Sequence, residues 1–148
     1  KNVGDTTQSA GYRSSGSSEI ASATASFGDS YTTNDIIGIA IDVNNSKLYF
    51  SKNGVWQNSG VPTSGSTGTG ALSMPVGVSS CEDGAYFFGF GDTSTGSNTA
   101  PKFSFNFGNG YFATTAVTSA GTNASDNGVF EYDVPTGYTA LSTKGLNS

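Results

Sequence analysis

The absence of histidine limits the chemistry open to this sequence. Its 148 residues include no histidine and a single cysteine, Cys81. The Ser–His and Cys–His nucleophilic pairs, the commonest proton shuttle near neutral pH and the commonest transition-metal ligand are therefore missing. Cys81 has no partner for an internal disulfide, and it is expected to act as a small buried hydrophobic residue.

Two carboxylates, Glu131 and Asp133, stand at alternate positions in a stretch that is typical of a strand. Side chains two residues apart in a strand point to the same face, and a retaining glycosidase needs two carboxyl groups about 5–5.5 Å apart. Glu131 and Asp133 are therefore candidates for the two catalytic carboxyl groups of such an enzyme. The interpretation preferred on the residues alone is that both carboxylates are solvated.

Oxygen-bearing side chains also cluster in three short polar stretches, which raises the question of calcium. None of these stretches has the glycine and the terminal glutamate of an EF-hand loop. Asp and Asn side chains commonly hydrogen-bond their own backbone in tight turns, so turn formation explains the clusters better. The sequence predicts no metal and no cofactor. The clusters are Asp42 with Asn44, Asn45 and Ser46; Glu82 with Asp83; and Asp92 with Thr93 and Ser94.

Aromatic residues and their polar neighbours are the remaining material for a binding site. Aromatic faces stack on sugar rings, and Tyr, Trp and Arg anchor protein partners. Trp56 either packs on its own sheet or contacts a ligand, and the same two alternatives stay open for the other candidates. The candidate binding residues are Tyr12, Arg13, Trp56, Asn109 and Tyr111.

Composition and charge narrow the fold and the partners. Charged residues make up 11% of the chain, against roughly 25% in typical soluble domains. The net charge is −5 and the six basic residues are scattered, which argues against nucleic acid as a partner. No segment approaches the roughly 18 apolar residues of a membrane span. The 21 glycines and 17 Phe and Tyr residues favour short strands between turns, and the length suits one domain, residues 1–148.

Alternating apolar residues predict where strands lie. Residues 37–41 and 48–50 predict an antiparallel hairpin, and Asn53-Gly54 predicts a type I′ turn that returns the chain through residues 55–56. Further strands are expected within residues 72–78, 85–91, 102–108, 129–134 and 138–143. The cleanest of these places Phe103, Phe105 and Phe107 on one face, so we expect the three rings to point into the core.

The stretch "DIIGIAIDVNNSKLYFSKNGVW" resembles the middle of a SPRY domain. The matching residues of the family pattern are Asp35, Ile37, Gly38, Asp42, Phe50, Lys52, Asn53 and Gly54. "FNFGN" at 105–109 is similar to a later strand of the family. "VGDTTQSAGYRSSG" at 3–16 and "PTGYTALSTKGLN" at 135–147 resemble the SPRY-like domains of phage and marine viral proteins.

The resemblance implies a concanavalin A-like sandwich of two antiparallel sheets that binds partners through its loops and does not catalyse a reaction. Such sandwiches also include glycosidases with an E-x-D-x-x-E strand, but Thr136 stands where the third carboxylate would be. The aromatic strand and the I-G-I/V strand that open SPRY domains have no match before residue 3. We therefore expect this chain to lack its N-terminal strands and to be a segment of a longer, multidomain protein whose preceding residues complete the sheets. The alternative is that a neighbouring subunit donates the missing strands.

Taken together, the sequence predicts a noncatalytic binding module of a phage or viral structural protein, such as a tail fibre, tailspike or capsid decoration. The expected partners are a host-surface glycan or protein receptor, or neighbouring virion proteins, in an extracellular virion and in a homo-oligomer such as a fibre trimer. Two alternatives remain: a structural spacer or assembly domain of a fibre, and a glycoside hydrolase.

Overall fold

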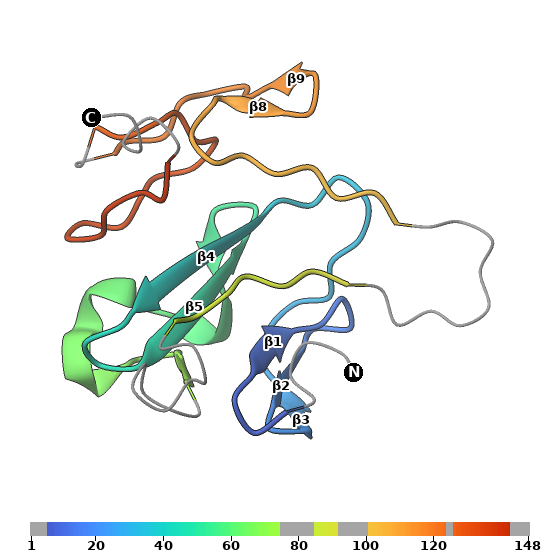
Figure 1. Cartoon of the computed structure of the whole chain (residues 1–148), viewed down its shortest axis with the longest axis vertical. Helices are drawn as coiled ribbons and strands as arrows, with labels where there is room; N and C mark the ends of the chain where they lie inside the picture. The colour runs from blue at the N-terminus through green and yellow to red at the C-terminus, as the bar shows by residue number, and fades with distance from the viewer. Residues whose placement is uncertain (1–5, 75–84, 92–100, 124–125, 143–148) are drawn as a thin grey trace. The chain divides into compact units, whose positions relative to one another are not determined.

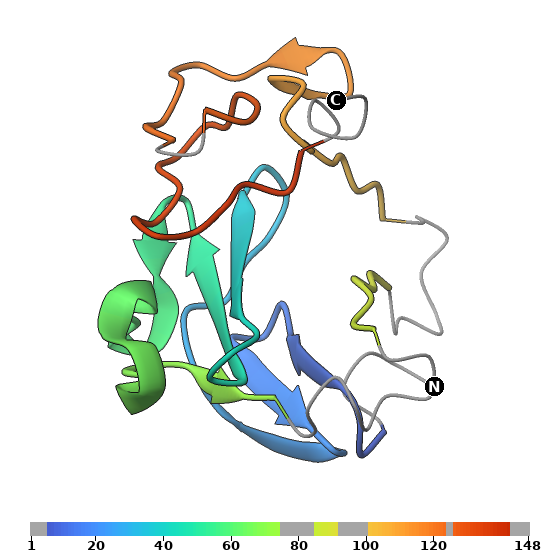
Figure 2. The same cartoon turned by 60° about the vertical axis from the view of Figure 1, so that its left-hand side comes forward.

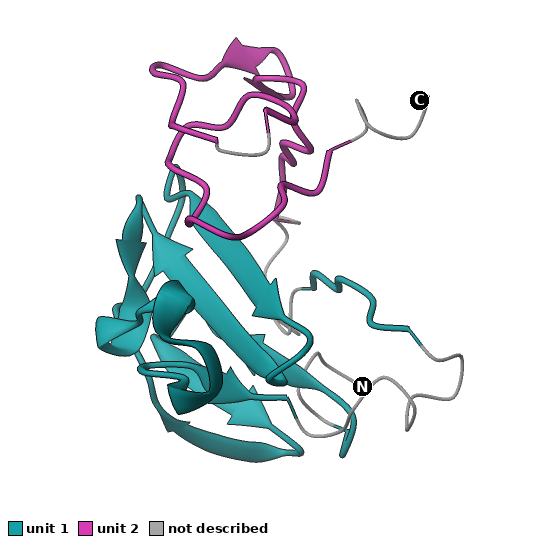
Figure 3. Cartoon of the chain, turned by 90° about the vertical axis from the view of Figure 1, so that its left-hand side faces the viewer, with its two compact units in different colours: residues 1–100 teal, residues 101–148 magenta. Residues whose placement is uncertain are grey.

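The structure is a computed structural model that describes residues 6–74, 85–91, 101–123 and 126–142. The chain divides into two compact units, residues 1–100 and 101–148, which Figure 3 distinguishes by colour. Cys81 and the expected polar clusters at 82–83 and 92–94 lie outside the described residues.

The first sheet of unit 1 is a three-stranded antiparallel meander. It consists of β1 (Ala10–Tyr12), β2 (Ser17–Ile20) and β3 (Ala23–Ser26), in that order across the sheet (Figure 1). Tyr12 lies opposite Ser18, and Ser18 lies opposite Ala25. Small and hydroxyl residues dominate β3, whose four residues are all exposed.

The second sheet contains the predicted hairpin. β4 (Ile37–Asp42) pairs along its whole length with β5 (Lys47–Lys52), and β5 also pairs with β6 (Val55–Trp56) and β7 (Leu72–Ser73). Asn53 and Gly54 have φ values of 49° and 81°, the left-handed backbone that a type I′ turn requires. The predicted hairpin, its turn and the return strand are confirmed.

Two short 3₁₀ segments follow β6 and lie beside this sheet, η1 (Gln57–Ser59) and η2 (Pro62–Thr67) (Figure 2). The hydroxyl group of the buried Tyr49 is 3.2 Å from Ser64 Oγ in η2. η2 therefore covers the face of β5 that points away from the core between the sheets.

The two sheets of unit 1 share one apolar core. The first sheet contributes Tyr12, with Phe27 directly after β3, and the second contributes Leu48, Phe50 and Leu72, with Met74 directly after β7. The ring of Phe50 lies 5.5 Å from that of Tyr12 and 6.2 Å from that of Phe27, centroid to centroid. Together with the antiparallel sheets and the near absence of helix, this packing confirms the predicted all-β fold.

Unit 2 has much less regular structure. Its described strands are β8 (Tyr111–Phe112) and β9 (Thr115–Ala116), which pair with each other, and an isolated bridge joins Asn109 to Val129. Elsewhere the backbone is held by scattered bonds: Gly121 N donates to Phe130 O, and Val134 N donates to Thr122 O, each at 2.8 Å. In the described part of this unit, the backbone hydrogen bonds thus lie mainly in irregular turns.

The prediction that Phe103, Phe105 and Phe107 point into the core is wrong. Their side chains are 48%, 42% and 41% exposed, and each ring stacks on the next, with centroids 6.5 and 6.2 Å apart. Within the described part of the chain, no strand pairs with residues 102–107. Because a strand buries its face only when neighbouring elements cover it, the three rings cover one another instead.

Other expected strands differ from the structure in the same way. The stretch 72–78 forms only β7 at its start, and its residues from 75 onward lie outside the described part. Residues 85–91, 129–134 and 138–142 have no regular strand. Each stretch has an alternating or aromatic-rich sequence, but within the described part of the chain no strand pairs along it.

Candidate binding loop

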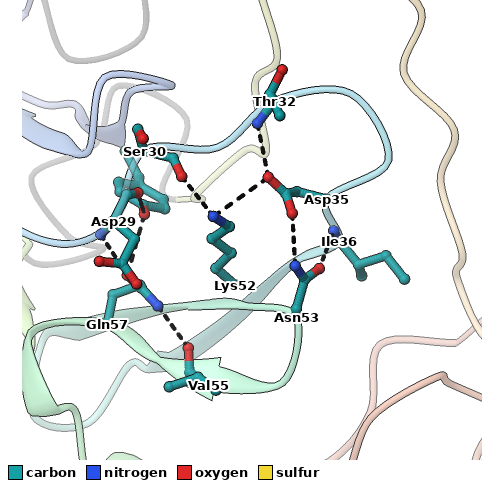
Figure 4. Close-up of polar contacts among 10 residues, drawn as sticks. Asp29, Ser30, Thr32, Asp35, Ile36, Lys52, Asn53, Val55 and Gln57 are labelled. Carbon is teal, nitrogen blue, oxygen red and sulfur yellow. Dashed lines mark hydrogen bonds and ion pairs between the residues drawn. The ribbon is translucent and has the colours of Figure 1, made fainter.

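The best-defined candidate site is the loop of residues 29–36, which connects the first sheet to β4; we call it the tethered loop. Figure 4 shows three side chains from the neighbouring β5–β6 region reaching toward it: Lys52, Asn53 and Gln57. Two of these residues, Lys52 and Asn53, belong to the F-x-K-N-G pattern that resembles the SPRY family. The pattern thus places its polar residues where they hold a loop.

Asn53 fixes the end of the tethered loop with both atoms of its side-chain amide. Its Nδ2 donates to Asp35 Oδ1 at 2.7 Å, and its Oδ1 accepts a hydrogen bond from Ile36 N at 2.8 Å. The backbone N–H of Asn53 also donates to Ile36 O at 2.8 Å. A residue at a turn with positive φ therefore closes the entrance to β4 through three hydrogen bonds.

Asp35 and Lys52 hold the middle of the tethered loop. Lys52 Nζ donates to Ser30 O at 2.7 Å and lies 3.5 Å from Asp35 Oδ2, while Thr32 N donates to the same Asp35 oxygen at 2.9 Å. The hydrogen bond from the Thr32 backbone, followed by that from Asn53, lowers the pKa of Asp35 below its ordinary value. The carboxylate is thus ionised at neutral pH, as its bonding requires.

Gln57 fixes the start of the tethered loop from inside the protein. Its buried side chain accepts a hydrogen bond from Asp29 N at 2.7 Å through Oε1 and donates to Val55 O at 2.9 Å through Nε2. Tyr12 donates its hydroxyl proton to Asp29 O. Gly28 allows this close approach, because a Cβ there would lie 2.5 Å from Gln57 Oε1.

The groups that remain exposed on the tethered loop are polar. Ser30, Thr32, Thr33 and Asn34 are all exposed, and Asn34 has a positive φ of 71°. The backbone beneath them is held at Asp29, Ser30, Thr32 and Ile36 by the bonds described above. The loop therefore presents hydroxyl and amide groups on a backbone that is already ordered, which reduces the entropy lost on binding.

The structure places Tyr12 and Arg13 in structural contacts. The Tyr12 ring is buried and contacts the rings of Phe27, Tyr31 and Phe50. Burial, followed by the charge of Asp29, raises the pKa of Tyr12 above 10.0. Arg13 pairs with the buried carboxylate of Glu19, with Nε to Oε2 at 2.6 Å. Both residues stabilise the first sheet, and Tyr12 also bonds the tethered loop through Asp29 O and Tyr31.

Trp56 is half-buried and packs edge-on against Tyr49, with ring centroids 6.4 Å apart and planes at 81°. Of the two alternatives for this residue, packing on its own sheet is therefore present in the structure. Ligand contact by the exposed part of its ring stays a prediction.

Asn109 and Tyr111 lie together in unit 2, and both are exposed. Asn109 Oδ1 accepts a hydrogen bond from Tyr111 N at 3.1 Å. Their turn is organised by Asn106, whose Oδ1 accepts from Gly108 N at 2.8 Å and whose Nδ2 donates to Val129 O at 2.9 Å. The N-F-G pattern thus supplies a turn that presents the Tyr111 ring.

The carboxylates considered for catalysis are used as hydrogen-bond acceptors. Glu131 accepts from the hydroxyl and the backbone N–H of Thr118, and Asp133 accepts from Thr122 N at 2.6 Å. These bonds lower both pKa values. A glycosidase needs one carboxylic acid with a raised pKa to protonate the leaving group, so two lowered values do not suit this chemistry.

The turn interpretation also accounts for the Asp42 cluster. Asp42 accepts hydrogen bonds from the backbone N–H of Asn45 at 3.0 Å and from its side-chain amide at 2.7 Å. Within the described ranges, no three His, Cys, Asp or Glu residues lie close enough together to hold a metal ion. In the same ranges no helix has the length and apolar character needed to cross a bilayer.

Comparison with known families assigns the fold. Residues 1–91 match the SPRY domain family, so this chain belongs to that family. Comparisons with curated proteins and with solved structures gave no match. SPRY domains are generally noncatalytic and mediate protein–protein interactions, which makes this chain a member of a class of binding modules.

Reasoning from sequence did not single out the exposed residues of the tethered loop. Thr32, Thr33 and Asn34 carry no aromatic or charged signal, and polar residues of this kind fill most loops of the chain. The usable signal was indirect: Asp35, Lys52 and Asn53 all belong to the family pattern. Polar residues that recur in a family pattern need hydrogen-bond partners. In the structure, the partners of Lys52 and Asn53 lie in the tethered loop.

Proposed function

We propose that this chain is a noncatalytic binding module that recognises a protein partner through the exposed face of the tethered loop. The main support for the proposal is that the backbone of this loop is held in place while its side chains are exposed. Its backbone is fixed from below by Lys52, Asn53 and Gln57, while Thr32, Thr33 and Asn34 face solvent. A fixed backbone whose polar side chains make no hydrogen bond with any described residue is well suited to hydrogen-bonded recognition.

The setting that we propose is a phage or other viral structural protein, exposed on the virion as part of a tail, fibre or capsid decoration. It rests on the likeness of residues 3–16 and 135–147 to viral SPRY-like domains. In this setting the partner is a neighbouring virion protein or a host-surface receptor, and fibre assembly would present the loop in several copies. Repetition of a weak site raises its avidity without new contacts.

A host-surface glycan is the second candidate target. The observation that favours it is the weakly charged, hydroxyl- and amide-rich surface, together with the exposed Tyr111 ring beside Asn109. Sugar hydroxyl groups exchange hydrogen bonds with such residues, and an aromatic ring can cover the apolar face of a pyranose.

The test compares the intact chain with two variants on a glycan array and on immobilised structural proteins of the particle that carries it. The loop variant combines Thr32→Ala, Thr33→Ala and Asn34→Gly, the last of which keeps the positive φ. The matched control, Ser66→Ala with Thr67→Ala, removes exposed hydroxyl groups from η2.

A protein partner whose affinity falls about tenfold or more with the loop variant, and not with the control, supports the proposal. Glycan binding that depends on Tyr111 and not on the loop supports the second candidate instead. If the intact chain binds neither class, the domain is a spacer and the proposal is wrong.

A further inference from the structure

The chain contains three Asn-Gly dipeptides, Asn53-Gly54, Asn109-Gly110 and Asn127-Gly128. In such a pair the glycine backbone nitrogen can attack the asparagine side-chain carbonyl carbon. A new C–N bond forms, the bond to the amide nitrogen breaks and ammonia leaves with the proton, giving a succinimide ring. Water then opens the ring to aspartate or isoaspartate. Glycine favours the attack because it has no Cβ and the freest backbone.

The structure protects Asn53 from this reaction. Both side-chain amide atoms are engaged, Nδ2 with Asp35 and Oδ1 with Ile36 N, at 2.7 and 2.8 Å. To swing toward the Gly54 nitrogen, the amide would have to give up both bonds. Asp35 is itself held by Thr32 N and Lys52, so it cannot follow the amide.

Asn109 is protected in part. Its Oδ1 accepts a hydrogen bond from Tyr111 N at 3.1 Å, but no described residue accepts from its Nδ2. The attacking group is also engaged, because Gly110 N donates to Asn106 Oδ1 at 3.3 Å. This bond is long, so it restrains the Gly110 nitrogen less than a bond of normal length would.

Asn127 has the least restrained side chain of the three. Its backbone carbonyl accepts a hydrogen bond from Asn123 Nδ2 at 2.6 Å, whereas its side-chain amide makes no hydrogen bond with any described residue. Gly128 has a φ of +80°, a conformation natural to glycine, and its N–H likewise has no partner among the described residues. Gly128 O accepts a further, long hydrogen bond from Asn123 Nδ2 at 3.4 Å. Among the described residues, then, the backbone of this pair is held through its carbonyl groups, whereas no hydrogen bond restrains the attacking nitrogen or the Asn127 side-chain amide.

We propose that Asn127 is a site of spontaneous succinimide-mediated modification in the folded protein, while the contacts of Asn53 with Asp35 and Ile36 shield Asn53. The order of reactivity is Asn127, then Asn109, then Asn53. Loss of two hydrogen bonds before reaction makes Asn53 slower than Asn127 by about tenfold or more. The product carries an added negative charge at position 127, and in the isoaspartate form a longer backbone.

The experiment incubates the intact chain in mildly alkaline buffer, with and without denaturant, and follows aspartate and isoaspartate at each site by peptide mass spectrometry. In the folded chain we expect conversion first at Asn127 and last at Asn53. In denaturant the three sites should convert at similar rates, because each is then an unstructured Asn-Gly pair. Equal rates in the folded chain, or Asn53 reacting first, would overturn the proposal.

A variant tests the shield directly. Asp35→Ala should accelerate conversion at Asn53 several-fold and leave Asn127 unchanged. The matched control is Asp42→Ala, which removes another aspartate that bonds an asparagine in a turn, and Asn53 should not respond to it. Amide exchange of β5 verifies that each variant is folded. No acceleration at Asn53 in a folded Asp35→Ala chain would show that the contact does not shield it.

Discussion

Residues 37–41 of unit 1 and residues 103–107 of unit 2 both carry bulky apolar side chains at every second position, and the two segments fold differently. The first is β4, paired residue by residue with β5, and Ile37, Ile39 and Ile41 pack against the core. In the second, the three phenylalanine rings stack on one another and remain close to half exposed.

The difference lies in what surrounds each segment. β4 continues into a short turn that returns as β5, so its hydrogen-bonding partner and its apolar neighbours are a few residues away in sequence. The phenylalanine segment has no such return within the described part of unit 2. Alternation therefore makes a segment able to form a strand, whereas pairing and cover decide whether it does.

The largest effect expected from this comparison is on unfolding free energy. Phe50→Ala removes a ring that is 7% exposed and touches both Tyr12 and Phe27, and it should destabilise the protein by about 3–5 kcal/mol. Phe105→Ala removes a ring that is 42% exposed and should cost about 1 kcal/mol or less. Denaturant unfolding of both variants measures the difference. Equal losses would mean that the phenylalanine segment is covered in solution.

The tethered loop is an irregular segment whose backbone is held by side chains from other elements. Gln57→Ala leaves Asp29 N without its acceptor and opens space beneath the loop, at an expected cost of about 2 kcal/mol. Gln8→Ala, which truncates an exposed glutamine, serves as the control and should have little effect. Unfolding and amide exchange at Asp29 test this, and an unchanged exchange rate would contradict the assigned role of Gln57.

Tyr12→Phe should have a smaller effect, about 1 kcal/mol, because it removes one hydrogen bond and keeps the packed ring. The pKa of Tyr12 is raised in the folded state, so its contribution is fully present below pH 10 and falls as the pH rises through the higher folded-state value. The free energy of unfolding should therefore decrease less steeply with rising pH in Tyr12→Phe than in the wild type, across the alkaline range. Parallel curves would argue against this assignment.

The smallest expected effect is a loss of amide protection in the tethered loop at acidic pH. The pKa of Asp35 is lowered in the folded state, so its contribution is present above its ordinary value of 3.8 and is lost as the pH falls through the lower folded-state value. Asp35→Asn should flatten this response. Amide exchange of Thr32 and Ile36 against pH measures it, with Ala40 in β4 as the internal reference. A response at Ala40 as strong as at Thr32 would indicate global acid unfolding.

The all-β class and the β4–β5–β6 meander were both predictable from the residues alone. The signals were local: alternating residues, an Asn-Gly turn and short connections specify a hairpin through contacts between near neighbours. The family pattern around Asp35, Lys52 and Asn53 was also legible in the sequence, and it marked the residues that hold the tethered loop.

The exposure of each aromatic residue and the choice of polar residues that face solvent were not predictable in this way, because they depend on long-range packing. Tyr12 was a candidate for surface contact and is buried, while Phe105 was expected in the core and is exposed. Tyr12 is buried because Phe27 and Phe50, from other parts of the chain, close around it. Burial depends on elements brought together from distant positions in the sequence, and the period of a single segment does not specify which elements those are.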